Sequence, residues 1–294
     1  HESGFELTSI PAHEATLEEV DRVEKEAGAS GARFLVAVGG GSKIDITKVA
    51  AARLKLPFVS VPTSAAHDGI SSPRASIHGI DTVSSIEAVV PVGVLADTSV
   101  IVQAPFRLLA SGCADVLSNV TAVLDWKLAA RLRNEEFSST AATLSEYTAS
   151  EIADHAALIK PGLEESVWIA IRPMIVAGIA MSVAGSSRPC SGSEHLFSHA
   201  LDHVAKHPSL HGEQCGVGAI MMMYLHGGEW RRLRTALATI GAPTTARELG
   251  VTSEEVVEGL VQAHRMRERY TILGDNGLTR EAAERLATVT GVIG

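Results

Sequence analysis

The chain has 294 residues, of which 46% are hydrophobic and 20% are charged, and its formal net charge is −9. This length suits two packed domains, and the composition is that of a folded protein rather than a disordered one. An acidic chain repels phosphate backbones, so nucleic-acid binding is disfavoured. Three widely spaced cysteines without a C-x-x-C pair exclude a disulfide framework and suit a reducing compartment, so we expect a cytoplasmic protein. No run of about eighteen apolar residues occurs, so no membrane insertion is expected.

Residues 1–105 alternate helical patterns with short apolar runs. Helical spacing predicts helices at residues 15–27 and 44–54, and apolar runs predict strands at residues 34–38, 57–61 and 89–95. Residues 71–87 mix small polar residues with isolated hydrophobic ones, which indicates a loop or hairpin over the sheet edge. Strands separated by helices are typical of a parallel α/β sheet. We therefore expect a Rossmann-like nucleotide-binding domain over residues 1–105, one that lacks its first one or two strands because such sheets normally have more than three.

Residues 106–294 are dominated by long aliphatic stretches with a period of 3.6 residues and contain no convincing strand. We expect an all-α metal- and substrate-binding domain here. Its predicted helices cover residues 106–131, 135–155, 164–185, 193–206, 213–225, 229–240, 253–271 and 280–288.

A glycine-rich turn follows the first predicted strand. Gly39, Gly40, Gly41 and Ser42 lie between that strand and the next helix. Glycines let the backbone approach a diphosphate, and a helix N-terminus offers amide groups and partial positive charge to it. The alternative is a tight strand-to-helix turn without a ligand. In that case Asp45 and Lys48 would form an exposed pair on the helix.

A polar loop follows the second predicted strand. It contains Thr63, Ser64, His67, Asp68 and Ser72. Ligands of open α/β sheets bind at the carboxyl ends of the strands, which is where this loop begins. An ordinary polar turn would have a similar composition, and spacing alone does not exclude it.

Histidines concentrate in the predicted helical domain. His195 and His199 are four residues apart and project from one helical face, His211 follows at the apparent start of another helix, and Asp115 lies early in a third. Two imidazoles and a carboxylate form a catalytic zinc set with an open coordination position. Helical spacing would allow both His195 and His199 to bind the metal, so the residues alone do not decide between them.

Four longer stretches identify a resemblance that covers nearly the whole chain from Gly39 to Leu273. They are SVPTSAAHDGISSPRASI (60–77), LLASGCADVLSN (108–119), GSSRPCSGSEHLFSHALD (185–202) and LHGEQCGVG (210–218). The chain resembles the sn-glycerol-1-phosphate dehydrogenases of the dehydroquinate synthase-like, iron-containing alcohol dehydrogenase superfamily. The resemblance implies NAD- or NADP-dependent reduction of dihydroxyacetone phosphate to glycerol 1-phosphate, the first step of archaeal-type membrane phospholipid synthesis. It also implies a strand–helix–strand segment before the part of the family pattern present here.

The resemblance assigns roles to particular residues. It implies zinc ligation by Asp115, His195 and His211, with nickel or iron as alternatives. It implies that His199, Asp68 and Asp115 contact the substrate. Zinc would polarise the substrate oxygens, with His199 as our candidate for proton delivery. The residues it places along the dinucleotide are Gly39, Gly40, Gly41, Ser42, Lys43, Asp45, Thr63, Ser64 and Ser72.

The substrate phosphate requires a cation, and our candidate is Arg188, with Lys206 behind it. Glycerol dehydrogenase and a dehydroquinate synthase-like enzyme are alternatives within the superfamily. An inactive metal-binding remnant is the alternative outside catalysis. The sequence does not choose between NAD and NADP, and we expect a homo-oligomer that acts on a small molecule.

Overall fold

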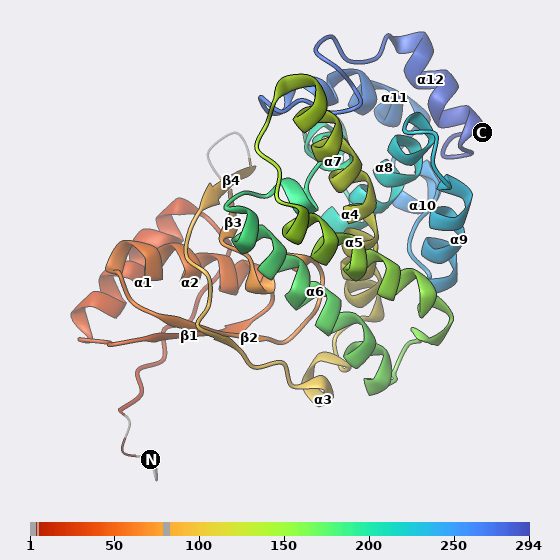
Figure 1. Ribbon diagram of the computed structural model, residues 1–294. Helices are drawn as coiled ribbons and strands as arrows, with labels where there is room; N and C mark the ends of the chain where they lie inside the picture. The colour runs from red at the N-terminus through yellow and green to blue at the C-terminus, as the bar shows by residue number, and fades with distance from the viewer. Residues whose placement is uncertain (1–3, 5, 79–82) are drawn as a thin grey trace.

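The computed structural model describes residue 4, residues 6–78 and residues 83–294. An α/β part occupies one side of the molecule and a larger helical part the other, coloured red to orange and green to blue in Figure 1. The first elements are α1 Leu17–Ala29, β1 Leu35–Gly39, α2 Gly41–Leu54, β2 Phe58–Pro62 and β5 Gly93–Val94. In the described residues these strands form one parallel sheet in the order β1–β2–β5. The alternating strand and helix pattern of the sequence is confirmed.

A β-hairpin follows the second strand, as one of the two alternatives for residues 71–87 predicted. Its strands are β3 Arg74–His78 and β4 Val83–Glu87, which pair antiparallel with Arg74 opposite Glu87. Residues 79–82 lie outside the described part of the chain. The hairpin packs against α2, whose fully buried Lys48 donates a 2.7 Å hydrogen bond to the carbonyl of Arg74.

Beyond residue 94 the described chain contains helices and no strand. The α-helices are α3 Thr98–Ile101, α4 Phe106–Arg133, α5 Ser139–Asp154, α6 Glu164–Ala184, α7 Ser193–Val204, α8 His211–Leu225, α9 Trp230–Ile240, α10 Ala246–Leu249, α11 Ser253–Gln262 and α12 Arg280–Val289. The 3₁₀ helices of this part are η2 Ala156–Leu158, η3 Arg188–Cys190 and η4 Ala263–Arg265, and one more, η1 Asp68–Ser71, lies earlier, between β2 and β3. The helical character predicted from the 3.6-residue period is confirmed.

The predicted helix that differs most from the structure is the one over residues 253–271. We expected a continuous helix over residues 253–271, but α11 ends at Gln262 and gives way to η4. The segment beyond is anchored to α4, because the amide of Ile272 donates a 2.7 Å hydrogen bond to the Asp125 carboxylate.

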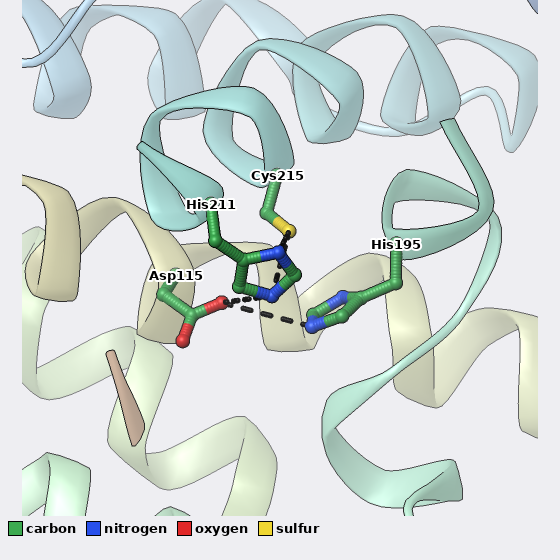
Figure 2. Close-up of side chains that lie close together, drawn as sticks. All are labelled: Asp115, His195, His211 and Cys215. Atoms are coloured by element: carbon green, nitrogen blue, oxygen red, sulfur yellow. Dashed lines mark hydrogen bonds and ion pairs between the residues drawn. The ribbon is translucent and has the colours of Figure 1, made fainter. Parts of the chain in front are cut away.

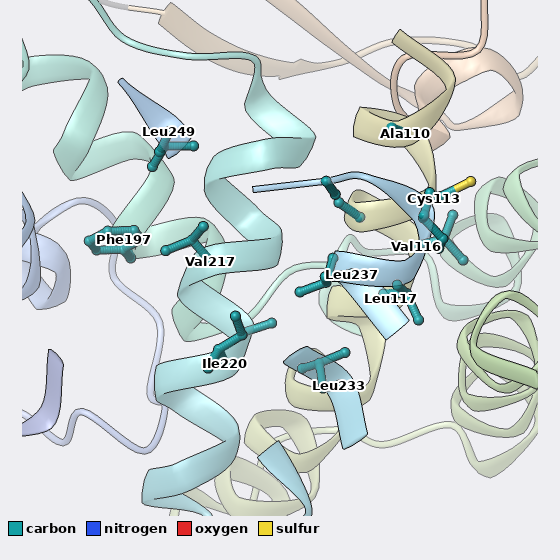
Figure 3. Packing of buried hydrophobic residues seen from close by; sticks show 14 of the residues in the cluster. Ala110, Cys113, Val116, Leu117, Phe197, Val217, Ile220, Leu233, Leu237 and Leu249 are labelled. Atoms are coloured by element: carbon teal, nitrogen blue, oxygen red, sulfur yellow. The ribbon is translucent and has the colours of Figure 1, made fainter. Parts of the chain in front are cut away.

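The core is centred on α4. Side chains of α4 such as Cys113 and Leu117 lie near Leu237 of α9, with Val217 and Ile220 of α8 alongside (Figure 3). The same buried cluster also includes residues of the sheet, Ala37 and Phe58 among them. Residue 105 therefore marks a change in secondary structure, whereas a division into two domains there stays a prediction.

Two helices, α4 and α6, are long and apolar enough to cross a bilayer by length and composition alone. Within their most apolar windows, 83% of α4 and 56% of α6 is buried inside the protein. Core helices of soluble proteins pass the same test when other helices cover them. Since α4 forms the centre of the core, its apolar character is accounted for by packing.

Candidate active site

Three helices bring together the three predicted metal ligands. Asp115 comes from α4, His195 from α7 and His211 from the first position of α8. Asp115 Oδ1 lies 3.7 Å from His195 Nε2 and 3.8 Å from His211 Nε2 (Figure 2). A side chain at Gly212 would place its Cβ 2.1 Å from the carbonyl oxygen of Ser111. Glycine is therefore required for α8 to begin directly against α4, which is what brings His211 to Asp115.

The surrounding hydrogen bonds turn these donor atoms toward one another. Asp115 is 1% exposed, and its Oδ2 accepts a 3.0 Å hydrogen bond from the amide of Asp68. His195 Nδ1 lies 2.9 Å from Glu194 Oε1, and His211 Nδ1 lies 3.1 Å from Ser198 Oγ. Such partners on the far nitrogen orient metal-binding imidazoles.

One oxygen of the cluster has no partner. Among the described residues, Asp115 Oδ1 is buried without a hydrogen bond, although a buried polar atom is normally paired. It faces two Nε2 atoms, so a carboxylate and two imidazoles point at a common place. The donor set fits a divalent metal ion of the zinc type.

Sequence reasoning missed a fourth potential donor in this cluster. Cys215 Sγ lies 3.5 Å from His211 Nε2, and the four donor atoms lie within 4.8 Å of one another (Figure 2). The available signal was the four-residue spacing from His211, which places both side chains on one helical face. Burial raises the pKa of the Cys215 thiol well above its usual value.

The cluster opens into a cavity of about 640 Å³ between the α/β part and the helices. Several predicted site residues line it: Ser42, Asp45, Asp68, Ser72, Asp115, His195, His199 and His211. His67, Arg74 and Arg267 also line it, and no role had been predicted for them. The structure thus brings the predicted metal ligands, three of the predicted substrate residues (Asp68, Asp115 and His199) and part of the predicted cofactor set to one cavity.

The remaining predicted cofactor residues lie at the end of the sheet and do not line this cavity. The amide of Thr63 donates a 3.0 Å bond to the carbonyl of Gly39, and a Cβ at Gly40 would lie 3.1 Å from Ser64 Oγ. The glycine turn and the polar loop are therefore in contact. Lys43 donates to the carbonyl of His13. Contact of these residues with a dinucleotide stays a prediction.

Helix α2 begins at Gly41, three positions before the helical spacing first predicts it at Ile44. A Cβ at Gly41 would lie 2.1 Å from His67 Nε2, so the His67 ring lies directly against the helix N-terminus. Burial lowers the pKa of His67. The N-terminus of α2 next to this ring is the kind of place where a helix binds an anion.

Asp45 and Lys48 are not the exposed pair of the alternative interpretation. Asp45 is 4% exposed, Lys48 is fully buried, and their charged atoms lie 3.0 Å apart. Lys48 also bonds the carbonyls of Gly69 and Arg74 and lies 3.4 Å from Ser72 Oγ. The pair joins the polar loop and the hairpin to α2, so Asp45 and Ser72 have structural partners in addition to their place on the cavity.

Burial shifts the titration of the groups that face the cavity. Burial, followed by the neighbouring Asp115, raises the pKa of Asp68 well above its usual value. Burial lowers the pKa of His195 to about 3 and that of His199 to about 2, with Arg267 as the second cause for His199. Arg267 Nη2 lies 2.9 Å from His199 Nε2, so a neutral His199 accepts from the guanidinium. Proton delivery by His199 stays a prediction, and it requires Arg267 to leave that nitrogen.

The structure does not bring Arg188 to the cavity that holds Asp115. Its guanidinium bonds both carboxylate oxygens of Glu135 and, at 2.9 Å, the carbonyl of Tyr270. It lines another cavity of about 550 Å³, which has Arg267 in common with the Asp115 cavity. Lys206 is exposed on the outside. Among the described residues, the arginines that line the Asp115 cavity are Arg74 and Arg267, so the position of Arg188 does not support the prediction that it holds the substrate phosphate.

Comparisons with known proteins show the family of this chain. Residues 1–105 match the family model described as iron-containing alcohol dehydrogenase. The chain is 58% identical over 291 residues to glycerol-1-phosphate dehydrogenase [NAD(P)+] of Methanothermobacter thermautotrophicus, covering 99% of this chain and 83% of that protein. It is 51% identical to the protein of the same name from Pyrococcus horikoshii, covering 98% and 84%.

Solved structures share the fold at lower identity. A probable glycerol dehydrogenase from Sinorhizobium meliloti superposes with a TM-score of 0.76 at 20% identity, covering 96% of this chain and 84% of that one. Glycerol dehydrogenase from Schizosaccharomyces pombe gives 0.75 at 21% identity, covering 94% and 73%. The expected fold class, α/β followed by helices, is confirmed.

Proposed function

This chain belongs to the glycerol-1-phosphate dehydrogenase family, and from that premise we propose that it is an NAD(P)-dependent oxidoreductase that interconverts dihydroxyacetone phosphate and glycerol 1-phosphate. The observation that carries the proposal is the meeting of Asp115, His195 and His211, from three helices, on one cavity. Relatives at 51–58% identity favour this substrate over those of glycerol dehydrogenase and dehydroquinate synthase. An assembled donor set also weighs against an inactive remnant.

We propose that Asp115, His195 and His211 hold one divalent metal ion, with zinc as the first choice and nickel or iron as alternatives. When bound, such an ion supplies Lewis acidity to the substrate oxygens. The protein supplies orientation. The partners of both Nδ1 atoms fix the rings, and the buried Asp115 carboxylate contributes the negative charge of the set.

The neighbouring side chains have roles that follow from their protonation. Asp68 has a raised pKa, so as a carboxylic acid it would donate a hydrogen bond to a substrate oxygen. His199 lies on the same cavity, where it would contact the substrate and accept or deliver a proton. A bound nicotinamide would supply or accept the hydride. Gly39, Gly40 and the helix N-terminus at Gly41 would hold the diphosphate.

The wider role follows from the product. Glycerol 1-phosphate would enter phospholipid synthesis of the archaeal type. We also infer that the protein is cytoplasmic and forms a homo-oligomer. Sedimentation velocity would measure the oligomeric state. Initial rates with each nucleotide would decide between NADH and NADPH.

The test is to assay the zinc-loaded protein with dihydroxyacetone phosphate and with dihydroxyacetone. Oxidation of NADH or NADPH is followed by absorbance. The proposal expects turnover of dihydroxyacetone phosphate. Reduction of dihydroxyacetone alone would identify a glycerol dehydrogenase instead. Bound zinc without turnover of either ketone would identify a metal-binding remnant. Asp115→Asn should abolish turnover, whereas Asp202→Asn removes a charge from the same cavity without removing a ligand and should retain most of it.

A further inference from the structure

A cationic side chain with no carboxylate partner faces the substrate cavity. Arg267 lines the cavity, and its Nη2 donates to His199 Nε2 at 2.9 Å. Among the described residues, no carboxylate forms an ion pair with Arg267 within 4.0 Å. In the described part of the chain, this half-buried guanidinium contacts the His199 ring and lacks the counter-charge that buried cations normally require.

A second arginine faces the same cavity from the opposite part of the molecule. Arg74 begins β3 of the hairpin, whereas Arg267 follows η4 in the helical part. Burial, followed by the positive charge of Arg74, lowers the pKa of Arg267. Two like charges that repel across one cavity are both stabilised when an anion binds between them.

The carboxylates on the cavity are already engaged elsewhere. Asp45 pairs with Lys48, and Asp202 accepts a 2.9 Å bond from Gln214. Asp115 faces the two histidines. Asp68 lies beside Asp115, because its amide donates a 3.0 Å hydrogen bond to Asp115 Oδ2. Among the described residues, none of these carboxylates forms an ion pair with Arg267.

We propose that Arg267, opposite Arg74, binds the phosphate group of the substrate and so selects phosphorylated over unphosphorylated ketones. The inference rests on the proposed function and extends it. The position suits a triose phosphate. Arg267 contacts His199, whose ring centroid lies 6.0 Å from that of His211. One carbon and one oxygen separate the phosphorus of dihydroxyacetone phosphate from its carbonyl carbon. The arginine fork matches phosphate oxygens, and the phosphate would replace the His199 contact.

The test compares Arg267→Gln with Arg265→Gln, a matched change at an exposed arginine two positions earlier. Arg267→Gln should raise KM for dihydroxyacetone phosphate about 10- to 100-fold, the effect of losing a charge-assisted hydrogen bond. KM for dihydroxyacetone should change less than about two-fold, and Arg265→Gln should change neither. An equal rise for both ketones overturns the inference while the proposed function stands.

A binding measurement tests the same site without turnover. Inorganic phosphate, titrated by calorimetry into the zinc-loaded protein, should bind Arg267→Gln and Arg267→Lys at least about 10-fold more weakly than the unmutated chain, because lysine lacks the bidentate fork. Arg267→Lys keeps the charge and provides a readout if Arg267→Gln fails to fold. Equal phosphate affinity in all variants overturns the inference. If the unmutated protein reduces neither ketone, the proposed function fails, and the calorimetry still decides whether Arg267 binds phosphate.

Discussion

Replacing Asp115 with asparagine should have opposite effects on the metal-free and the metal-loaded protein. Without metal, the buried Oδ1 accepts no hydrogen bond from the described residues and faces two imidazole nitrogens at 3.7 and 3.8 Å. An asparagine can keep its oxygen toward the amide of Asp68, 3.0 Å from Oδ2, and turn its NH₂ group toward the imidazoles. The free energy of unfolding of the metal-free protein should rise by about 1 kcal/mol, since an unsatisfied buried acceptor costs ~1–3 kcal/mol.

Metal binding should weaken in the same variant. Loss of a residue that only orients a ligand costs about 10- to 100-fold in affinity, so loss of the single charged ligand should cost at least ~100-fold. At a metal concentration well above the dissociation constant, this removes about 2.7 kcal/mol of metal-linked stabilisation. Urea unfolding with and without zinc measures both quantities.

Asp202→Asn is the matched control for Asp115→Asn. Asp202 lines the same cavity but is not one of the ligands, so zinc should still stabilise the Asp202→Asn variant. If Asp115→Asn retained the full stabilisation by zinc, the assignment of Asp115, His195 and His211 as a metal site would be wrong.

Three further perturbations test other parts of the structure. Gly41→Ala should weaken nucleotide binding about 10-fold, because overpacking against His67 costs ~1–3 kcal/mol, and His67→Ala in the same chain should restore it in a fluorescence titration. Lys48→Met should lower the free energy of unfolding by about 3–5 kcal/mol because it leaves Asp45 buried without its partner. Adding Asp45→Asn should recover most of this loss in urea unfolding. A double variant as unstable as Lys48→Met would contradict the pairing of Asp45 with Lys48. The pKa of His199 is about 2 in the folded state and near 6.5 in the unfolded state. Below pH 6.5 the unfolded state therefore binds one more proton, and the free energy of unfolding decreases as the pH is lowered. The free energy of unfolding of the metal-free protein decreases between about pH 7.5 and about pH 5, and His199→Gln should make this decrease smaller by ~2 kcal/mol. The same decrease in His199→Gln and in the unmutated protein would refute the lowered pKa of His199.

The sequence by itself determined the elements and the chemical types of the donors. Alternating apolar runs and helical periods predicted the strands of the sheet and the helices of the second half, because hydrophobic periodicity is a local property of the chain. The spacing of His195, His199 and His211 on helices, with Asp115 on another, predicted a metal site for the same reason. The hairpin at residues 74–87 was predicted only as an alternative to a loop.

Only the tertiary structure decided which side chains meet. The approach of α8 to α4 depends on Gly212 packing against the backbone of Ser111, about a hundred residues earlier in the chain, and no local pattern encodes this contact. The same holds for the cations. Arg188 and Arg267 look alike in the sequence, but folding gives Glu135 to the first and leaves the second facing the cavity. Long-range packing assigns the partner of a charged side chain, whereas the sequence supplies only the charge.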